Sequence, residues 1–180
     1  SRANTVDIRQ QGSRSTGTTN MFRVLGARAS LITFAGDVLK GVIADLIGLW
    51  TLGNAGAAMA GIAVVVGHTY PVFSKFRGGK GVATSLGTAF VLNPVLALIL
   101  LAISAVGIGL TRVVSIFSLL SLLAFGVINP FLCGGDPYEI VYSIVLLLLV
   151  FWAHRSNIGR MINGTEMNNR LDFSRKKTGR

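Results

Sequence analysis

The hydrophobic and polar positions of this chain fall into long blocks. Runs of apolar residues cover 31–50, 55–69, 83–92, 95–110, 114–132 and 139–153, and polar residues gather between the runs and at both ends. A helix needs about 20 apolar residues to cross a bilayer, or somewhat fewer when flanking side chains reach the interface. The shortest run ends at Asn93-Pro94, where proline breaks a helix. The pattern predicts an all-α, polytopic membrane helix bundle with six spans.

Composition supports a membrane protein. Hydrophobic residues make up 51% of the chain and charged residues 13%, and the mean hydropathy is +0.62. These values are typical of membrane proteins and not of water-soluble domains. A net charge of +10 would suggest nucleic-acid binding in a soluble protein. Here the positions of the basic residues explain that charge, so no nucleic-acid partner is expected.

The basic residues lie on every second connection between the apolar runs. All of them except Lys40 fall before the first run, between the second and third runs, between the fourth and fifth, or after the last. Cytoplasmic connections of membrane proteins carry the excess of Lys and Arg. The chain is therefore predicted to be a single integral membrane domain, 1–180. Residues 1–30 would form a cytoplasmic N-terminal motif segment and residues 154–180 a cytoplasmic C-terminal segment.

The first apolar run contains three charged residues, Asp37, Lys40 and Asp45. An unpaired charge inside a bilayer is expensive, so these side chains are expected to face the interior of the bundle. The spacing of Asp37 and Lys40 at i,i+3 allows them to pair. A structural ion pair between helices and a direct catalytic role both agree with this pattern.

A glycine-rich segment, 67–84, separates the second and third runs and also contains three cations and a histidine. Glycines let a backbone approach a ligand closely, and a lysine adds positive charge, which together are suited to binding phosphate. The spacing is not that of a nucleotide P-loop, because Ser74 takes the place of its first glycine and Gly81 follows Lys80. The alternative is an ordinary glycine-rich turn with cytoplasmic lysines.

Two further polar clusters are predicted on the same side of the membrane. The N-terminal segment 7–23 is rich in hydroxyl groups, with an amide and guanidinium groups that suit a phosphate ester. After the last run, His154 and Asn157 are spaced at i,i+3 and would share one face of a helix.

Taken in order, these motifs resemble the bacterial acyl-phosphate:glycerol-3-phosphate acyltransferases, the PlsY family. The chain reads Gly-Ser…Thr-Asn-x-x-Arg, Asp-Val-Leu-Lys-Gly, Gly-His-x-x-Pro-x-Phe…Gly-Gly-Lys-Gly-Val-Ala-Thr, Thr-Arg-x-Val-Ser and His-Arg-x-Asn-Ile-x-Arg…Gly-Thr-Glu. The resemblance runs from about Asp7 to Glu166. In the first motif the chain departs from the family at Arg14, Ser15 and Thr18. The family also has a helix ahead of this motif, so the chain is expected to lack its N-terminal helix.

The resemblance implies an enzyme of phospholipid synthesis in the bacterial inner (cytoplasmic) membrane, with its active site on the cytoplasmic face. Such an enzyme transfers a fatty acyl group from acyl phosphate to the 1-hydroxyl of glycerol 3-phosphate, giving lysophosphatidic acid and phosphate. The expected partners are these two substrates and membrane lipid. No metal and no cofactor are expected, because the acyl donor is already activated and no cluster of metal ligands is evident. The competing class is a membrane transporter of a phosphorylated small solute, for which an inverted repeat would be expected.

The resemblance also implies roles for individual residues. Catalytic roles are implied for Ser13, Arg23, Lys80, His154 and Asn157. Binding of substrate or phosphate is implied for Thr19, Asn20, Gly78, Gly79, Gly81, Thr84, Ser115 and Glu166. The base that activates the glycerol hydroxyl would be either a substrate phosphate or His154.

Overall fold

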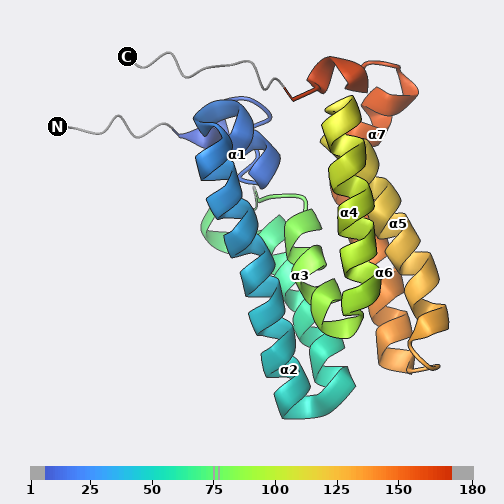
Figure 1. Ribbon diagram of the computed structural model, residues 1–180. Coiled ribbons are helices and arrows are strands. Elements are labelled where there is room, and N and C mark those ends of the chain that lie inside the picture. The colour runs from blue at the N-terminus through green and yellow to red at the C-terminus, as the bar shows by residue number, and fades with distance from the viewer. Residues whose placement is uncertain (1–6, 75, 77, 172–180) are drawn as a thin grey trace.

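The computed structural model describes residues 7–74, 76 and 78–171, and that part of the chain is helical with no strand (Figure 1). The α-helices are α1 (Thr18–Leu25), α2 (Ala27–Thr69), α3 (Val82–Leu92), α4 (Pro94–Thr111), α5 (Val114–Leu132), α6 (Pro137–Ala153) and α7 (Arg155–Ile162). Short 3₁₀ helices follow or precede them at Ile8–Gln10, Val72–Ser74 and Glu166–Asn169. The all-α prediction is confirmed.

Helix α2 is a hairpin of two antiparallel arms. Its backbone leaves helical geometry at Leu52 and Gly53, where Gly53 has a φ of 59°, and the chain reverses direction there (Figure 1). A left-handed φ is readily adopted by glycine, which explains the residue at this turn. The arms then cross at Gly48 and Gly56, whose backbones lie so close that neither position has room for a Cβ atom. The two arms correspond to the first two apolar runs of the sequence.

Each of the other apolar runs also forms a helix, and the break at Asn93-Pro94 separates α3 from α4 as expected. Asn93 caps α4, since its side-chain oxygen accepts a hydrogen bond from the Leu96 N–H. Among the described residues, three helical stretches are long and apolar enough to cross a membrane, Ala27–Ser74, Pro94–Thr111 and Val114–Leu132, and a fourth if the bent pair α6–α7 is one span. The first stretch includes both arms of α2. Six crossings remain a prediction.

Small residues allow the helices to approach one another closely. A Cβ on Gly41 of α2 would overlap the backbone of α3 at Thr84, and a Cβ on Gly87 of α3 would overlap the backbone of α2 at Val38. Close backbone approach at small residues is the usual way in which helices associate in membranes, where apolar contact with lipid competes with apolar contact between helices.

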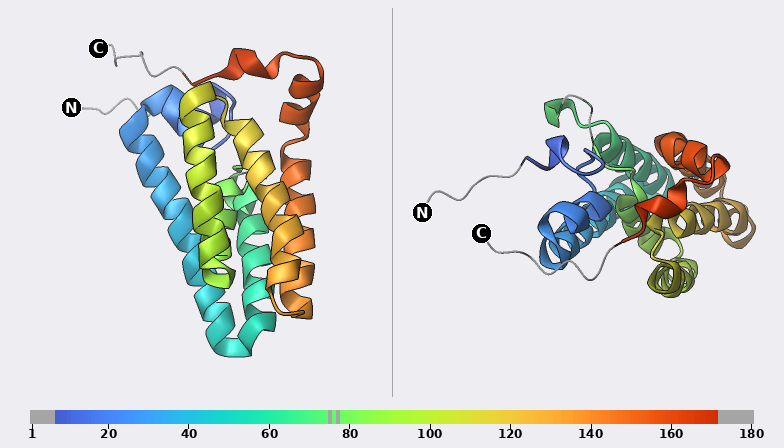
Figure 2. Two further views of the ribbon diagram at one scale, coloured as in Figure 1. Left: turned by 45° about the vertical axis from the view of Figure 1, so that its right-hand side comes forward. Right: turned by 90° about the horizontal axis from the view of Figure 1, so that it is seen from above.

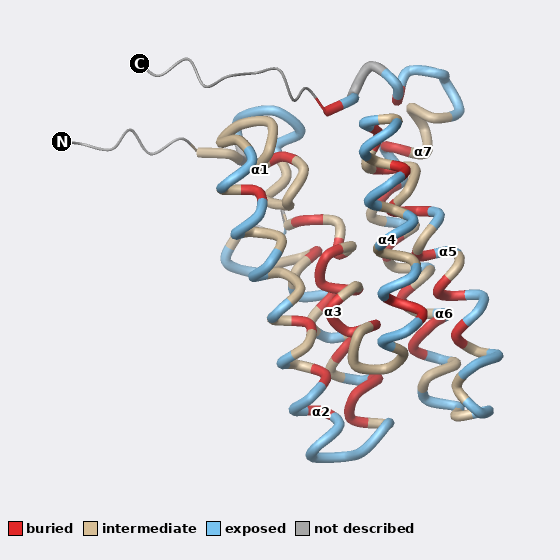
Figure 3. Tube along the Cα trace, viewed as in Figure 1, coloured by how far each residue is buried: buried red, intermediate tan, exposed pale blue. Residues whose placement is uncertain are grey.

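The interior of the bundle contains an apolar core, and much of its outer surface is apolar as well. Buried residues from α2, α3, α4, α5 and α6 pack in one core, which includes Val65, Leu122, Phe125, Leu146 and Val150. Large apolar side chains such as Ile32, Trp50, Leu110 and Phe131 are nevertheless exposed along the outside, where Figure 3 shows long exposed stretches on the helices. An exposed apolar belt of this extent indicates contact with lipid.

The connections separate into two ends of the bundle. Residues 7–17 with α1, and α7 with residues 163–171, lie at the same end (Figure 2). The Leu171 N–H donates to the Arg112 carbonyl there (2.8 Å), so the connection between α4 and α5 belongs to this end too. At the opposite end, Asn54 in the α2 turn donates to Asp136 (2.8 Å), which precedes α6. Arg23, Arg112 and Arg160 therefore lie at one end of the bundle, and the cytoplasmic position of that end stays a prediction.

The charged residues of the first α2 arm are oriented as expected. Lys40 Nζ donates to Asp37 Oδ1 at 2.6 Å, which confirms the predicted i,i+3 pair. Asp45 is fully buried, and neither of its carboxylate oxygens has a hydrogen-bond partner among the described residues. Asp45 lies beside Gly61 of the second arm and the ring of Tyr142 in α6.

Candidate functional site

A cavity of about 670 Å³ opens between the N-terminal segment and the helices at the basic end of the bundle. It brings together residues that are far apart in the sequence. Those of its lining residues that the sequence predicted are Ser13, Thr19, Asn20, Arg23, Lys80, Gly81, Ser115, His154, Asn157 and Glu166. Gly78, Gly79 and Thr84 lie outside the lining.

Three cations, Arg23, Lys80 and Arg160, converge on this cavity from α1, the connection before α3, and α7. Lys80 Nζ donates a hydrogen bond to Asn157 Oδ1. Burial, together with the positive charges of Arg160 and Arg23, lowers the pKa of Lys80 to about 8. Glu166 is a carboxylate that interacts with all three cations. Positive charge therefore exceeds negative charge in this cluster, which suits an anionic ligand.

Glu166 joins the elements around the cluster. It is buried, and it accepts hydrogen bonds from Ser115 Oγ, Asn157 Nδ2 (2.7 Å) and Arg160 Nε (2.6 Å). Burial opposes ionisation, but these hydrogen bonds outweigh it and hold the pKa of Glu166 below its usual value. Both carboxylate oxygens are thus engaged by protein donors at the cavity lining, and the substrate binding that the resemblance implies for Glu166 stays a prediction.

His154 lies buried at the junction of α6 and α7 and lines the cavity. Its Nδ1 is 2.9 Å from the Val150 carbonyl oxygen. Because a carbonyl oxygen only accepts, Nδ1 carries the hydrogen, and in the neutral ring Nε2 is then the acceptor. An imidazole in this tautomer can accept a hydrogen bond from a hydroxyl group in the cavity.

Asn20 organises the N-terminal segment. The buried side chain accepts from the Ser13 N–H (2.8 Å) and donates to the carbonyls of Ile8 (3.0 Å), Gln11 (3.2 Å) and Ser15 (2.8 Å). The segment thus turns around this amide, which binds the backbone of Ser13 at the cavity lining. The substrate contact that the resemblance implies for Asn20 stays a prediction.

The glycine loop, residues 78–81 of the glycine-rich segment, differs from a loop whose backbone N–H groups surround a phosphate. The Gly79 N–H donates to the His68 carbonyl (3.2 Å), and the Gly78 carbonyl accepts from Ser15 Oγ (3.2 Å). Only Gly81, with a φ of 84°, reaches the cavity lining, where it precedes α3. Thr84 is fully buried between helices. Lys80 is therefore the side chain of this loop that faces the cavity.

Two titratable or charged cavity residues, His68 and Arg160, were not given a site role from the sequence, and for Asp37 a catalytic role was one of two open alternatives. For Arg160 a signal existed, because it follows Asn157 by three positions and so lies on the same face of α7. The inward placement of His68 depends on contacts between distant segments, which spacing alone does not reveal.

The deeper part of the cavity is mostly apolar, with Ser104, Ser118 and Ser121 as its polar lining residues on α4 and α5. It lies between α3, α4, α5 and α6, and its lining there includes Ala89, Ala97, Leu100, Leu122, Phe125 and Leu146. The described residues contain no group of three or more His, Cys, Asp or Glu side chains that could hold a metal ion. The site thus combines a cationic, hydrogen-bonding end with an apolar chamber.

The fold and this site define a multi-pass helical membrane protein whose cavity suits an anionic molecule with an apolar part. The family model described as glycerol-3-phosphate acyltransferase matches residues 1–164. A protein of that name from Thermoanaerobacter sp. (strain X514) is 49% identical over 161 residues, which cover 89% of this chain and 81% of the relative. One from Bacillus subtilis (strain 168) is 38% identical over 161 residues, with 89% and 82% covered.

Solved structures agree with the sequence relatives. A crystal structure of PlsY (YgiH), an integral membrane glycerol 3-phosphate acyltransferase in its glycerol 3-phosphate form, has a TM-score of 0.85 and 35% identity, covering 93% of this chain and 84% of that one. The structure of its lysophosphatidic acid form has a TM-score of 0.79 and 35% identity, covering 86% and 79%. The chain belongs to the glycerol-3-phosphate acyltransferase family, and the resemblance seen in its motifs is confirmed.

Proposed function

We propose that this protein transfers a fatty acyl group from acyl phosphate to the 1-hydroxyl of glycerol 3-phosphate, releasing lysophosphatidic acid and inorganic phosphate. The observation that carries the proposal is the convergence of Arg23, Lys80 and Arg160 at the polar end of a cavity whose other end is apolar. Both substrates carry phosphate, and one also carries an acyl chain. A site for them needs cations beside an apolar chamber, and this cavity has both.

In the proposed reaction, the glycerol hydroxyl oxygen attacks the acyl carbon directly and the bond from that carbon to the phosphate oxygen breaks. Arg23, Lys80 and Arg160 hold the two anions together against their mutual repulsion and stabilise the oxyanion and the departing phosphate. His154 Nε2 accepts the hydrogen bond of the attacking hydroxyl, whose proton leaves to this ring or to a phosphate oxygen. Ser13 and Asn157 orient the substrates.

The charge distribution supports a position in the bacterial inner membrane with the site on the cytoplasmic face. The site lies at the end of the bundle that holds the basic connections, and cytoplasmic ends carry the excess of Lys and Arg. On this orientation the apolar runs make six crossings, and acyl phosphate and glycerol 3-phosphate reach the cavity from the cytoplasm.

The proposal is tested by supplying the purified protein in lipid vesicles with labelled glycerol 3-phosphate and one of three acyl donors: acyl phosphate, acyl-coenzyme A or acyl carrier protein. Labelled lysophosphatidic acid is expected with acyl phosphate alone. Product formed equally well from the coenzyme A donor would overturn the donor assignment. Uptake of glycerol 3-phosphate into sealed vesicles without any product would instead indicate a transporter.

The pKa of Lys80 predicts a pH dependence of catalysis. Because the pKa is lowered to about 8, Lys80 loses its charge in the substrate-free enzyme as the pH rises through that value. We expect kcat/KM to fall above pH 8, approaching about tenfold per pH unit. A Lys80→Arg variant is the control, since its guanidinium stays charged and its residual activity should show no such fall. A wild-type profile that stays flat from pH 7 to 10 would contradict the role of Lys80.

A larger side chain in the apolar chamber should change which acyl-chain length the enzyme prefers. Ala97 of α4 is buried and lines this chamber, so Ala97→Leu should shorten the space for the chain. We expect the ratio of kcat/KM for long over short acyl phosphates to fall by about tenfold. Ala102→Leu, on the exposed side of the same helix, is the matched control and should leave the ratio unchanged. An unchanged ratio in Ala97→Leu would place the acyl chain elsewhere.

A further inference from the structure

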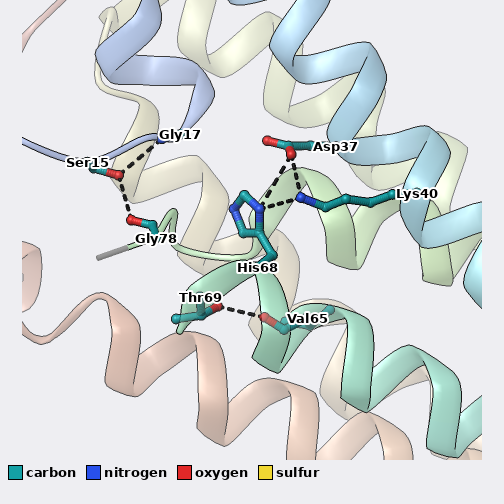
Figure 4. Close-up of polar contacts among 8 residues, drawn as sticks. All are labelled: Ser15, Gly17, Asp37, Lys40, Val65, His68, Thr69 and Gly78. Atoms are coloured by element: carbon teal, nitrogen blue, oxygen red, sulfur yellow. Dashed lines mark hydrogen bonds and ion pairs between the residues drawn. The ribbon is translucent and has the colours of Figure 1, made fainter. Parts of the chain in front are cut away.

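Three polar side chains, Asp37, Lys40 and His68, meet between the two arms of α2 (Figure 4). Lys40 Nζ contacts both Asp37 Oδ1, at 2.6 Å, and His68 Nδ1, while Asp37 Oδ1 lies 3.4 Å from the same ring nitrogen. The first arm supplies the ion pair, and the second arm carries the histidine one residue before its end at Thr69. The ion pair thus holds the His68 ring in one orientation.

His68 in turn supports the glycine loop. Its carbonyl accepts the hydrogen bond of the Gly79 N–H (3.2 Å), and its ring lies against the Gly79 Cα so closely that a Cβ there would overlap Nε2. A Cβ on Gly78 would overlap the carbonyl oxygens of His68 and Thr69. The loop therefore lies directly on the end of α2, and the next residue along the chain is Lys80.

The N-terminal segment holds the loop from the other side. Ser15 Oγ donates to the Gly78 carbonyl and accepts from the Gly17 N–H, each at 3.2 Å (Figure 4). A Cβ on Gly17 would be 3.5 Å from the Gly79 Cα, so the two backbones are adjacent. Ser15 is one of the positions at which the first motif departs from the family, yet here it makes a defined contact with the loop.

We propose that Asp37 and Lys40 are positioning residues that act through His68 to place the glycine loop, and with it Lys80, at the cavity. The inference rests on the proposed function of Lys80 in binding phosphate. Lys40 is partly exposed, and an ion pair of this kind contributes little net stability, while charges within membrane helices are costly. The Asp37–Lys40 pair therefore has a role other than stability, which is to position Lys80.

The contact between Gly79 and His68 is tested by a compensating pair of substitutions. Gly79→Ala should displace Lys80 and reduce kcat/KM by about 100-fold, because a shift of about 1 Å in a binding group has this effect. Adding His68→Ala removes the overlapping ring, so the double variant should recover about tenfold over Gly79→Ala. Gly67→Ala is the matched control, since a Cβ there meets open space next to His68, and its activity should equal that of the wild type.

The effect of the ion pair is measured as binding of inorganic phosphate by calorimetry, which does not require acyl transfer. Lys40→Met and His68→Ala should each weaken binding by about tenfold, and the double variant should bind no more weakly than His68→Ala, because both act through the same ring. Thermal unfolding of each variant confirms that it is folded.

The outcomes separate the two proposals. If the two losses in phosphate affinity multiply to about 100-fold in the Lys40→Met/His68→Ala variant, the positioning network is overturned. A Gly79→Ala/His68→Ala variant with a lower kcat/KM than Gly79→Ala would overturn it too. A wild-type protein that binds phosphate with the expected coupling but forms no lysophosphatidic acid would overturn the proposed function and leave the network standing.

Discussion

Replacing Lys80 with alanine is expected to lower kcat/KM by about 100- to 1000-fold while leaving the fold intact. Lys80 lines the cavity, and its ammonium group meets Asn157 beside Arg23 and Arg160. Removing it takes away a positioned charge from the point where phosphate would bind. The loop that carries it lies outside the apolar core, so little packing is lost. Steady-state kinetics with acyl phosphate and glycerol 3-phosphate measure the effect.

Two variants make this result specific to Lys80. Lys80→Arg should recover little of the lost activity, because a planar guanidinium does not replace a compact ammonium group in a fitted site. Arg28→Ala removes an exposed cation from the same end of the bundle but outside the cavity lining, and should change kcat/KM less than twofold. Near-full activity of Lys80→Ala would show that phosphate is held elsewhere.

Glu166→Gln is expected to lower the melting temperature by about 5 °C and to reduce kcat/KM as well. The carboxylate accepts from Ser115, Asn157 and Arg160, and so joins α5 to α7. A glutamine amide would present N–H donors to the Arg160 Nε–H, which leaves that guanidinium without its acceptor. Thermal unfolding in detergent measures the stability, and the same kinetic assay measures the loss of alignment.

Asp136→Asn provides the control for removal of a carboxylate. Asp136 caps α6 at the opposite end of the bundle, and asparagine is an equally good cap. The contact with Asn54 that asparagine would lose is exposed, so both stability and kcat/KM should stay close to those of the wild type. If Glu166→Gln were as stable and as active as Asp136→Asn, the buried carboxylate would not be what holds the cations in place.

The helical framework could be predicted from the sequence because its signals are long and local. Each apolar run forms a helix or an arm of one, and Asn93-Pro94 ends α3 where expected. The pairing of Asp37 with Lys40 followed from i,i+3 spacing, since both lie on one arm of α2. The grouping of basic connections at one end followed from their alternation along the chain.

The arrangement within the site could be predicted only in part. The sequence identified about half of the polar residues that line the cavity, and it could not show which groups face inward. For Asn20, which the resemblance implies as a binding residue, the structure shows that its amide donates to the carbonyls of Ile8, Gln11 and Ser15, which the sequence did not predict. The Gly79 N–H likewise donates a hydrogen bond to the His68 carbonyl. These outcomes depend on contacts between distant segments, which residue spacing does not encode.

The most direct test of the central claim is the rate of labelled lysophosphatidic acid formation from acyl phosphate and labelled glycerol 3-phosphate by the protein in lipid vesicles, with released inorganic phosphate measured in the same reaction. We predict one phosphate released for each lysophosphatidic acid formed, and loss of both products in Lys80→Ala. Phosphate release without lysophosphatidic acid, or equal product formation by Lys80→Ala, would contradict acyl transfer at the site formed by Arg23, Lys80 and Arg160.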